Sequence, residues 1–128
     1  LYKGIAAAVD GARVGDIGHA VQSYAESFGF GVVRELEGHG IGTQMHESPG
    51  IPNYGRQGHG PKLRNGMTIC IEPMITAGSR NVYLDKNGWA VHTADHRNAA
   101  HYELTVVVRK GHAEQLSTFD FIENNVKF

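Results

Sequence analysis

The stretch TICIEPMI, residues 68–75, decides how this sequence is expected to fold, because it is a short apolar run interrupted by one acidic residue, Glu72. Such runs, rich in β-branched residues, are typical of buried strands. A second run, YELTVVV, residues 102–108, has Glu103 as its second residue. Side chains alternate between the faces of a strand, so Glu72 shares a face with Cys70. If the two strands are neighbours in one sheet, both carboxylates can point to one place.

The two glutamates need partners if the strands are buried. A carboxylate removed from water without a partner costs several kcal/mol, so we expect each to be paired with a cation or bound to a metal. An exposed sheet face, or an ion pair with Arg64, Arg97 or Arg109, is the alternative for either glutamate taken alone.

Two helices are expected before the strands. Residues 2–9 place apolar side chains on one helical face, and Gly11 interrupts that run. Asp16 is the predicted N-cap of a second amphipathic helix, which Gly29 ends at a C-cap position. Residues 31–34 then read as a short extended segment.

The Gly- and Pro-rich segment 38–66 is expected to be a loop, and its length suggests a functional reason. The chain after it is β-rich, with a hairpin turn at residues 85–88 and further strands at 102–109 and 113–118. We therefore predict an α+β architecture, with two helices followed by an antiparallel sheet, in a single domain that covers residues 1–128.

Composition excludes several classes of protein. The 128 residues include 12 Lys plus Arg and 13 Asp plus Glu, a net charge of −1 that argues against a general nucleic-acid or anionic-membrane binder. The apolar runs are too short to cross a bilayer, and no signal segment opens the chain. The single cysteine fits a reducing compartment. We expect a soluble, cytoplasmic protein, and the start at Leu1 suggests a processed chain or a piece of a longer one.

The densest group of chemistry-bearing residues is GHGIG, residues 38–42, followed by His46 and Glu47. Its spacing lacks the third glycine of a dinucleotide-binding loop, and prolines stand where the helix of that loop should run. A zinc-binding HExxH motif fails because a glycine replaces its second histidine. Ser48 lacks the strand-to-helix elbow of a hydrolase nucleophile.

His39, Glu72 and Glu103 together are a candidate metal site. One imidazole and two carboxylates form a mostly oxygen ligand set, which suits Mn(II), Fe(II), Co(II) or Zn(II) better than a soft thiolate site does. A single cysteine also excludes a cysteine-based structural zinc centre. For His39 alone, a role in a turn or in the core is the alternative.

In order and spacing, over nearly all of the chain, these residues resemble the C-terminal part of a bacterial-type (type I) methionine aminopeptidase. The matching stretches are residues 38–42, His46-Glu47, GMTICIEPM at 66–74, Gly88-Trp89 and Tyr102-Glu103. The resemblance implies part of the pita-bread (creatinase/aminopeptidase-like) fold. It also implies metal-dependent removal of the initiator methionine from nascent polypeptides by the intact protein.

The resemblance also assigns roles to single residues. The residues that match the family's metal ligands are His39, Glu72 and Glu103. The implied catalytic residues are His46, which contacts the substrate at the scissile amide, and Glu72, which also helps to shuttle the proton. Met45 and Trp89 match positions near the methionine pocket. A loop-capping imidazole is the alternative for His46, and an ordinary sheet aromatic is the alternative for Trp89.

The implied cofactors are divalent ions of Co, Mn, Fe or Zn, with up to two ions in the intact family site. The implied partner is the N-terminus of a nascent polypeptide, with a transient association with the ribosome. The resemblance implies neither nucleic-acid specificity nor a membrane.

The sequence departs from the family in several places. The family's two metal-ligand aspartates and a further substrate-contacting histidine precede the matched region and are absent, so we expect the 128-residue chain alone to bind metal weakly and to have little or no peptidase activity. His101 stands where relatives often have glutamine, and is either an exposed polar residue or a substitute ligand. Residues 53–60 are a candidate insertion at the rim of the cleft. A proline-directed peptidase of the same fold and a non-catalytic pita-bread binding module are the alternative functions.

Overall fold

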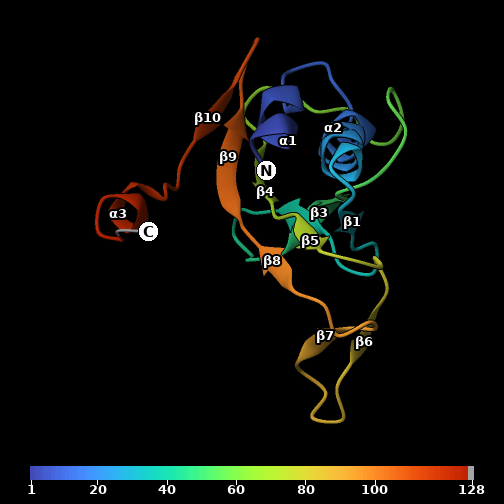
Figure 1. Cartoon of the computed structure of the whole chain (residues 1–128). Helices are drawn as coiled ribbons and strands as arrows, with labels where there is room; N and C mark the ends of the chain where they lie inside the picture. The colour runs from blue at the N-terminus through green and yellow to red at the C-terminus, as the bar shows by residue number, and fades with distance from the viewer. Residues whose placement is uncertain (127–128) are drawn as a thin grey trace.

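The computed structural model describes residues 1–126. It consists of two helices, three antiparallel sheets and a terminal helical turn (Figure 1). The helices are α1 (Tyr2–Ala7), α2 (Val14–Ser27) and α3 (Asp120–Glu123). The strands are β1 (Gly31–Val32), β2 (Gly38–Gly40), β3 (Glu47–Ile51), β4 (Thr68–Ile71), β5 (Met74–Thr76), β6 (Val82–Leu84), β7 (Val91–Thr93), β8 (Ala99–His101), β9 (Leu104–Val108) and β10 (Ala113–Gln115). The α+β prediction is confirmed.

Helix α2 begins at Val14, so the prediction that Asp16 is its N-cap is wrong. Asp16 is the third helical residue, and its carboxylate accepts a hydrogen bond of 2.7 Å from the backbone N–H of Arg13, the N-cap residue. An acidic residue three positions after the cap produces the same sequence signal as the cap itself. Gly29, at φ 78°, follows the last turn of the helix as predicted.

The central sheet has the strand order β10-β9-β4-β2-β3, and two of its strands lie in the segment that was expected to be a loop. That expectation is wrong for β2 and β3. The expectation of a loop was based on the glycine content, because glycine normally weakens a strand. Here the glycines allow close approach of the backbone, because a Cβ on Gly38 would collide with the carbonyl oxygen of Cys70 on β4.

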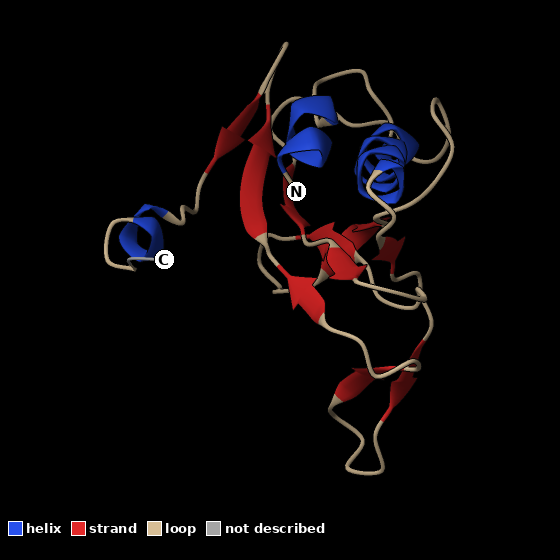
Figure 2. Cartoon of the chain, viewed as in Figure 1, coloured by secondary structure: helices blue, strands red, loops and turns tan. Residues whose placement is uncertain are grey.

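One face of this sheet packs against α1 and α2, which lie together beside it in Figure 2. The core side chains on β4 and β9 are Ile69, Ile71, Leu104, Val106 and Val108, and they cluster with Ile5 and Ala8 of α1 and with Val14 and Ile17 of α2. Because strand side chains alternate, Cys70 and Thr105 point to the other face. The sheet therefore presents its polar residues on the side away from the helices.

The predicted single strand 68–75 is two strands, because the chain leaves the central sheet at Glu72-Pro73 and enters a second sheet as β5. Proline has no N–H for the strand ladder, which explains the break. The second sheet has the order β1-β5-β8. Glu72 thus lies at the junction of two sheets.

Strands β6 and β7 form the predicted hairpin, which projects away from the helices in Figure 1. Its turn includes Gly88 at φ 72°, a conformation that favours glycine. Helix α3 was not predicted, and it lies apart from the sheets (Figure 2). Among the described residues, none of the helices is both long enough and apolar enough to cross a bilayer.

Candidate metal centre

Glu72 and His39 meet on the polar side of the central sheet. His39 is the middle residue of β2 and pairs with Cys70 of β4, two residues before Glu72. Its Nε2 atom lies 3.5 Å from Oε1 of Glu72, and both side chains are only 13% exposed. The two strands therefore bring together two of the three residues that the sequence nominated as ligands.

The His39 ring is held in an orientation that suits a ligand. Its Nδ1 lies 2.9 Å from the carbonyl oxygen of Gly40, which can only accept a hydrogen bond, so Nδ1 carries the proton. In the tautomer that donates from Nδ1 alone, the lone pair of Nε2 lies on the side of Glu72. Metal-binding histidines typically use this arrangement, with one nitrogen donating to the protein and the other binding the ion.

His101 provides a second imidazole at the same carboxylate. Its Nε2 lies 3.0 Å from Oε2 of Glu72. His101 is the last residue of β8, where it pairs with Met74 of β5, and about half of its side chain is exposed. Glu72 is therefore contacted by a histidine from each of the two larger sheets.

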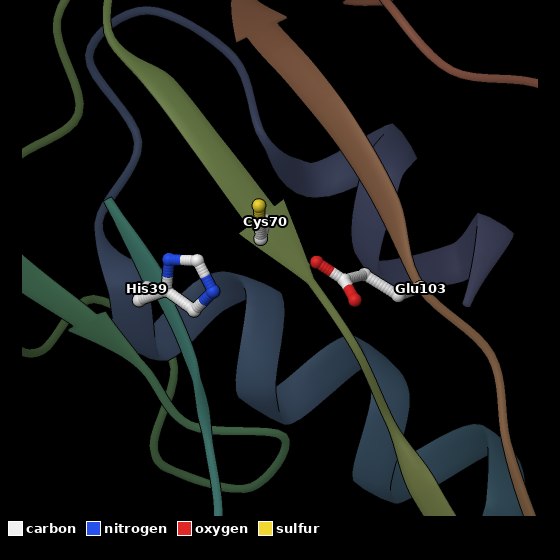
Figure 3. Close-up of side chains that lie close together, drawn as sticks. All are labelled: His39, Cys70 and Glu103. Carbon is white, nitrogen blue, oxygen red and sulfur yellow. The ribbon is translucent and has the colours of Figure 1, made fainter. Parts of the chain in front are cut away.

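Glu103 lies between β8 and β9 and completes two groups of potential ligands. The ligand atoms of Glu72, His101 and Glu103 all lie within 4.8 Å of one another, and the same holds for those of His39, Cys70 and Glu103. Figure 3 shows His39 and Glu103 on either side of the strand that carries Cys70, with their side chains turned toward it. The structure thus brings all three nominated ligands to one region.

Sequence reasoning did not nominate Cys70 as a donor, although strand alternation had placed it on the face of Glu72. Its side chain is 1% exposed, and Sγ lies 3.4 Å from Oγ1 of Thr105. Burial raises the pKa of the Cys70 thiol, and the Glu103 carboxylate raises it further, while the contact with Thr105 opposes the rise. The raised pKa favours the thiol over the thiolate.

The donor set fits a divalent transition metal. Within residues 1–126, Glu72 forms ion pairs with His39 and His101 and not with an arginine. Arg109, one of the proposed arginine partners, instead pairs with Glu114 at 2.8 Å. A poorly exposed carboxylate among imidazoles and a second carboxylate is typical of a divalent-metal site.

His46 lies next to this cluster. It comes from the turn before β3, and its ring centroid is 4.2 Å from that of His39, with the two planes tilted by 54°. The His46 side chain is exposed and lines a cavity of about 730 Å³ together with Glu72 and His101. A molecule in this cavity can therefore contact His46 and the candidate metal ligands Glu72 and His101 at the same time.

The rest of the cavity is mostly apolar, and the β6–β7 hairpin forms one side of it. Its other lining residues include Val33, Leu36, Met74, Val82, Trp89, Ala90, Val91, Ala99 and Ala100. Trp89 lines the cavity while remaining 86% exposed. Met45 is 70% exposed and is not a lining residue.

None of residues 53–60 lines this cavity, so the cavity gives no support to the suggestion that they rim the cleft. They pack instead on α2, where a Cβ at Gly15 or Gly18 would collide with the backbone oxygens of Arg56 and Tyr54. Asn53, at the start of this segment, is fully buried and donates from Nδ2 to the backbone oxygen of Glu72 at 3.2 Å. Sequence reasoning missed this support for Glu72, since a loop asparagine carries no distinctive pattern.

Comparison with known proteins agrees with this geometry. The model of metallopeptidase family M24 matches residues 1–110. A methionine aminopeptidase of Clostridium acetobutylicum is 54% identical over 108 residues, which cover 84% of this chain and 43% of that protein. The chain therefore spans less than half the length of this relative.

Solved structures give the same result. The methionine aminopeptidase of Thermotoga maritima superposes with a TM-score of 0.88 at 44% identity, covering 91% of this chain and 47% of that one. An X-Pro aminopeptidase from Thermotoga maritima is similar in fold alone, with a TM-score of 0.64 at 21% identity. The fold of the chain is that of the pita-bread proteins.

Proposed function

The chain belongs to the M24 metallopeptidase family, and from that premise we propose that it carries part of the metal centre and of the substrate cleft of a methionine aminopeptidase. Membership of a metallopeptidase family implies the use of a divalent metal. The proposed substrate is the N-terminal methionine of a nascent polypeptide. The proposed unit is a single domain formed by residues 1–128.

The observation that carries this proposal is the gathering of His39 and Glu103 near Glu72, which itself lines a largely apolar cavity. The 3.5 Å approach of His39 to Glu72 and the grouping of both glutamates with histidines place nitrogen and oxygen donors within reach of one cation. Borderline ions bind such mixed donors well, so Co, Mn, Fe or Zn is the proposed metal, with up to two ions.

When bound there, a divalent ion polarises a carbonyl group and lowers the pKa of water, which are the requirements of amide hydrolysis near neutral pH. In the proposed mechanism, the residues of the chain orient the substrate and move the proton. Glu72 accepts a proton from water and delivers it to the leaving amine. His46 donates a hydrogen bond at the scissile amide, beside His39.

The apolar part of the cavity is the proposed site for the methionine side chain. An unbranched thioether is flexible and polarizable, so it fills an irregular apolar site well and makes favourable contacts with an aromatic ring. Trp89, on the lining of the cavity, is the aromatic residue proposed for this contact. Met45 is proposed to contact the substrate from outside the cavity, where it is exposed.

The cell biology of the proposal follows from its substrate. A nascent polypeptide is available in the cytoplasm as it leaves the ribosome, so we place the activity there, with at most a transient association with the ribosome. Neither a nucleic acid nor a membrane is needed for it.

The proposal can be tested with a segment exchange. The chain would replace the matching part of the Thermotoga maritima methionine aminopeptidase, which it resembles over 91% of its own length. We expect the exchanged protein to release methionine from Met-Ala-Ser and to leave Ala-Pro-Ser intact. Glu72→Gln and Glu103→Gln should each abolish this release.

The outcomes separate the competing functions. A folded exchange protein that cleaves only Ala-Pro-Ser would indicate a proline-directed peptidase. One that binds metal and peptide without cleavage would indicate a binding module. The purified chain alone should release little methionine, because its ligand clusters within residues 1–126 contain no aspartate. Robust cleavage of Met-Ala-Ser by the chain alone would contradict this last point.

A further inference from the structure

Cys70 gives the metal centre a soft donor that the proposed function does not require. Its Sγ, a ring nitrogen of His39 and a carboxylate oxygen of Glu103 all lie within 4.8 Å of one another. We propose that these three residues form a binding site for a thiophilic divalent cation such as Zn²⁺, Cd²⁺ or Co²⁺. This inference rests on the proposed metal role of His39 and Glu103 and adds a thiolate ligand to it.

The strand register explains why the three side chains converge. His39 of β2 pairs with Cys70 of β4, and Cys70 pairs with Thr105 of β9. The Cα atoms of His39, Cys70 and Thr105 therefore form a row across the sheet, with their side chains on one face. Glu103 lies two residues before Thr105 and reaches back toward β4 (Figure 3). Backbone pairing therefore fixes Cys70 in the middle of the group.

The surroundings of Cys70 allow its sulfur to act as a ligand. Its polar contact outside the group is with Oγ1 of Thr105 at 3.4 Å, an ordinary distance for a hydrogen bond that involves sulfur. Burial to 1% exposure excludes competing water and limits oxidation of the thiol. Binding of the ion deprotonates the thiol, and the proton is released to solvent.

The two groups of ligands differ in chemical softness and share Glu103. The group with Cys70 offers nitrogen, sulfur and oxygen, whereas the group with Glu72 and His101 offers only oxygen and nitrogen. Thiolate ligands select zinc-like ions, and carboxylates suit manganese. We therefore expect Cys70 to raise the affinity for Cd²⁺ and Zn²⁺ much more than the affinity for Mn²⁺.

Titration of the purified chain with Co²⁺ tests the inference directly. A thiolate bound to Co²⁺ gives an intense charge-transfer absorption in the near ultraviolet, which oxygen and nitrogen ligands do not give. We expect this band in the wild-type chain and its loss in Cys70→Ser, in which a hydroxyl can still hydrogen bond to Thr105. His92→Gln is the matched control, because His92 lines the cavity but belongs to neither group, and it should keep the band.

Competition with other ions adds a quantitative readout. Cys70→Ser should weaken Cd²⁺ binding by roughly tenfold or more and leave Mn²⁺ binding nearly unchanged. Circular dichroism of Cys70→Ser and Cys70→Ala would establish that the variants are folded, and either folded variant suffices for the comparison.

Each result has a distinct meaning. Binding of Co²⁺ without the charge-transfer band, or a band that survives in Cys70→Ser, would overturn the thiolate site and leave the proposed function standing. Failure of the chain to bind any of these ions would overturn the thiolate site, while the segment exchange tests the proposed function independently. A cysteine-dependent band in a chain whose exchange protein is inactive would support the site and contradict the peptidase function.

Discussion

His101 contacts Glu72 more closely than His39 does, because its Nε2 lies 3.0 Å from Oε2 while His39 lies 3.5 Å from Oε1. The carboxylate is therefore held from both sides. Since His101 belongs to the three-stranded sheet and His39 to the five-stranded one, the orientation of Glu72 depends on how the two sheets meet.

Loss of the His101 contact should weaken metal binding. We expect His101→Ala to lower the affinity of the chain for Co²⁺ by about 10- to 100-fold, as is typical when the residue that orients a ligand is removed. His101→Gln should restore part of the affinity, because the amide can still donate to Glu72. Isothermal titration calorimetry would measure both.

His92→Ala is the control for this experiment. His92 lines the same cavity and faces Asp85 at 3.9 Å rather than Glu72. An equal loss of affinity in His92→Ala and His101→Ala would mean that the cavity as a whole, and not the contact with Glu72, affects the metal.

The close packing of α2 on the segment 53–60 predicts a large cost for Gly18→Ala. Alanine improves helix propensity by about 1 kcal/mol, but its Cβ would collide with the backbone oxygen of Tyr54. Overpacking against backbone typically costs about 1–3 kcal/mol, and here it must exceed the propensity gain. We expect a net loss of about 1–2 kcal/mol in the free energy of unfolding, measured with urea. Ser23→Ala, on the exposed side of α2, should be neutral or slightly stabilising.

Asp16 predicts a pH dependence of stability. Backbone N–H groups of Arg13 and Gly58 donate to its carboxylate at 2.7 Å each, and these bonds lower the pKa of Asp16 in the folded chain. A group with a lowered folded pKa stabilises the fold above its unfolded pKa, near 4, and this contribution is lost as the pH falls through the folded pKa. Asp16→Ala should therefore cost about 1 kcal/mol at pH 7 and much less at low pH. A difference between wild type and variant that is constant with pH would contradict this account.

Much of the site could be predicted because its signals are local. A glutamate inside an apolar strand run is anomalous on its own, and the alternation of β4 and β9 follows from the residues of each strand. The backbone pairing of β4 with β9 then brings Glu72 and Glu103 to the same side of the sheet. The two helices and the β6–β7 hairpin also follow from local spacing and turn residues.

The errors arise where tertiary contacts override local preference. Glycine is needed at strand positions 38 and 40 because the neighbouring backbone leaves no room for a side chain. A propensity scale contains no information about such contacts. The role of Asn53 depends on a partner 19 residues away in the chain. Cys70 was visible on the correct face, but its place beside Glu103 required the register of three strands.

Trp89 offers a direct probe of the cavity, because it is the single tryptophan of the chain. It lines the cavity and is 86% exposed, so its fluorescence should resemble that of tryptophan in water. Methionine amide resembles the N-terminal residue of a peptide, because neither has a free α-carboxylate. Its thioether should displace water from the indole of Trp89 and so shift the emission to shorter wavelength. The change should saturate with concentration.

Two comparisons make this test specific. Aspartic acid α-amide carries a charged side chain that an apolar cavity excludes, so it should produce no saturable change. Trp89→Phe should alter the free energy of unfolding by less than about 0.5 kcal/mol, since the side chain is largely exposed. It should weaken methionine amide binding in calorimetry only slightly, because phenylalanine keeps an aromatic face for the sulfur. Equal fluorescence responses to both amides would mean that the ligand reaches Trp89 without selection for an apolar side chain, and the assignment of the methionine site to this part of the cavity would then be wrong.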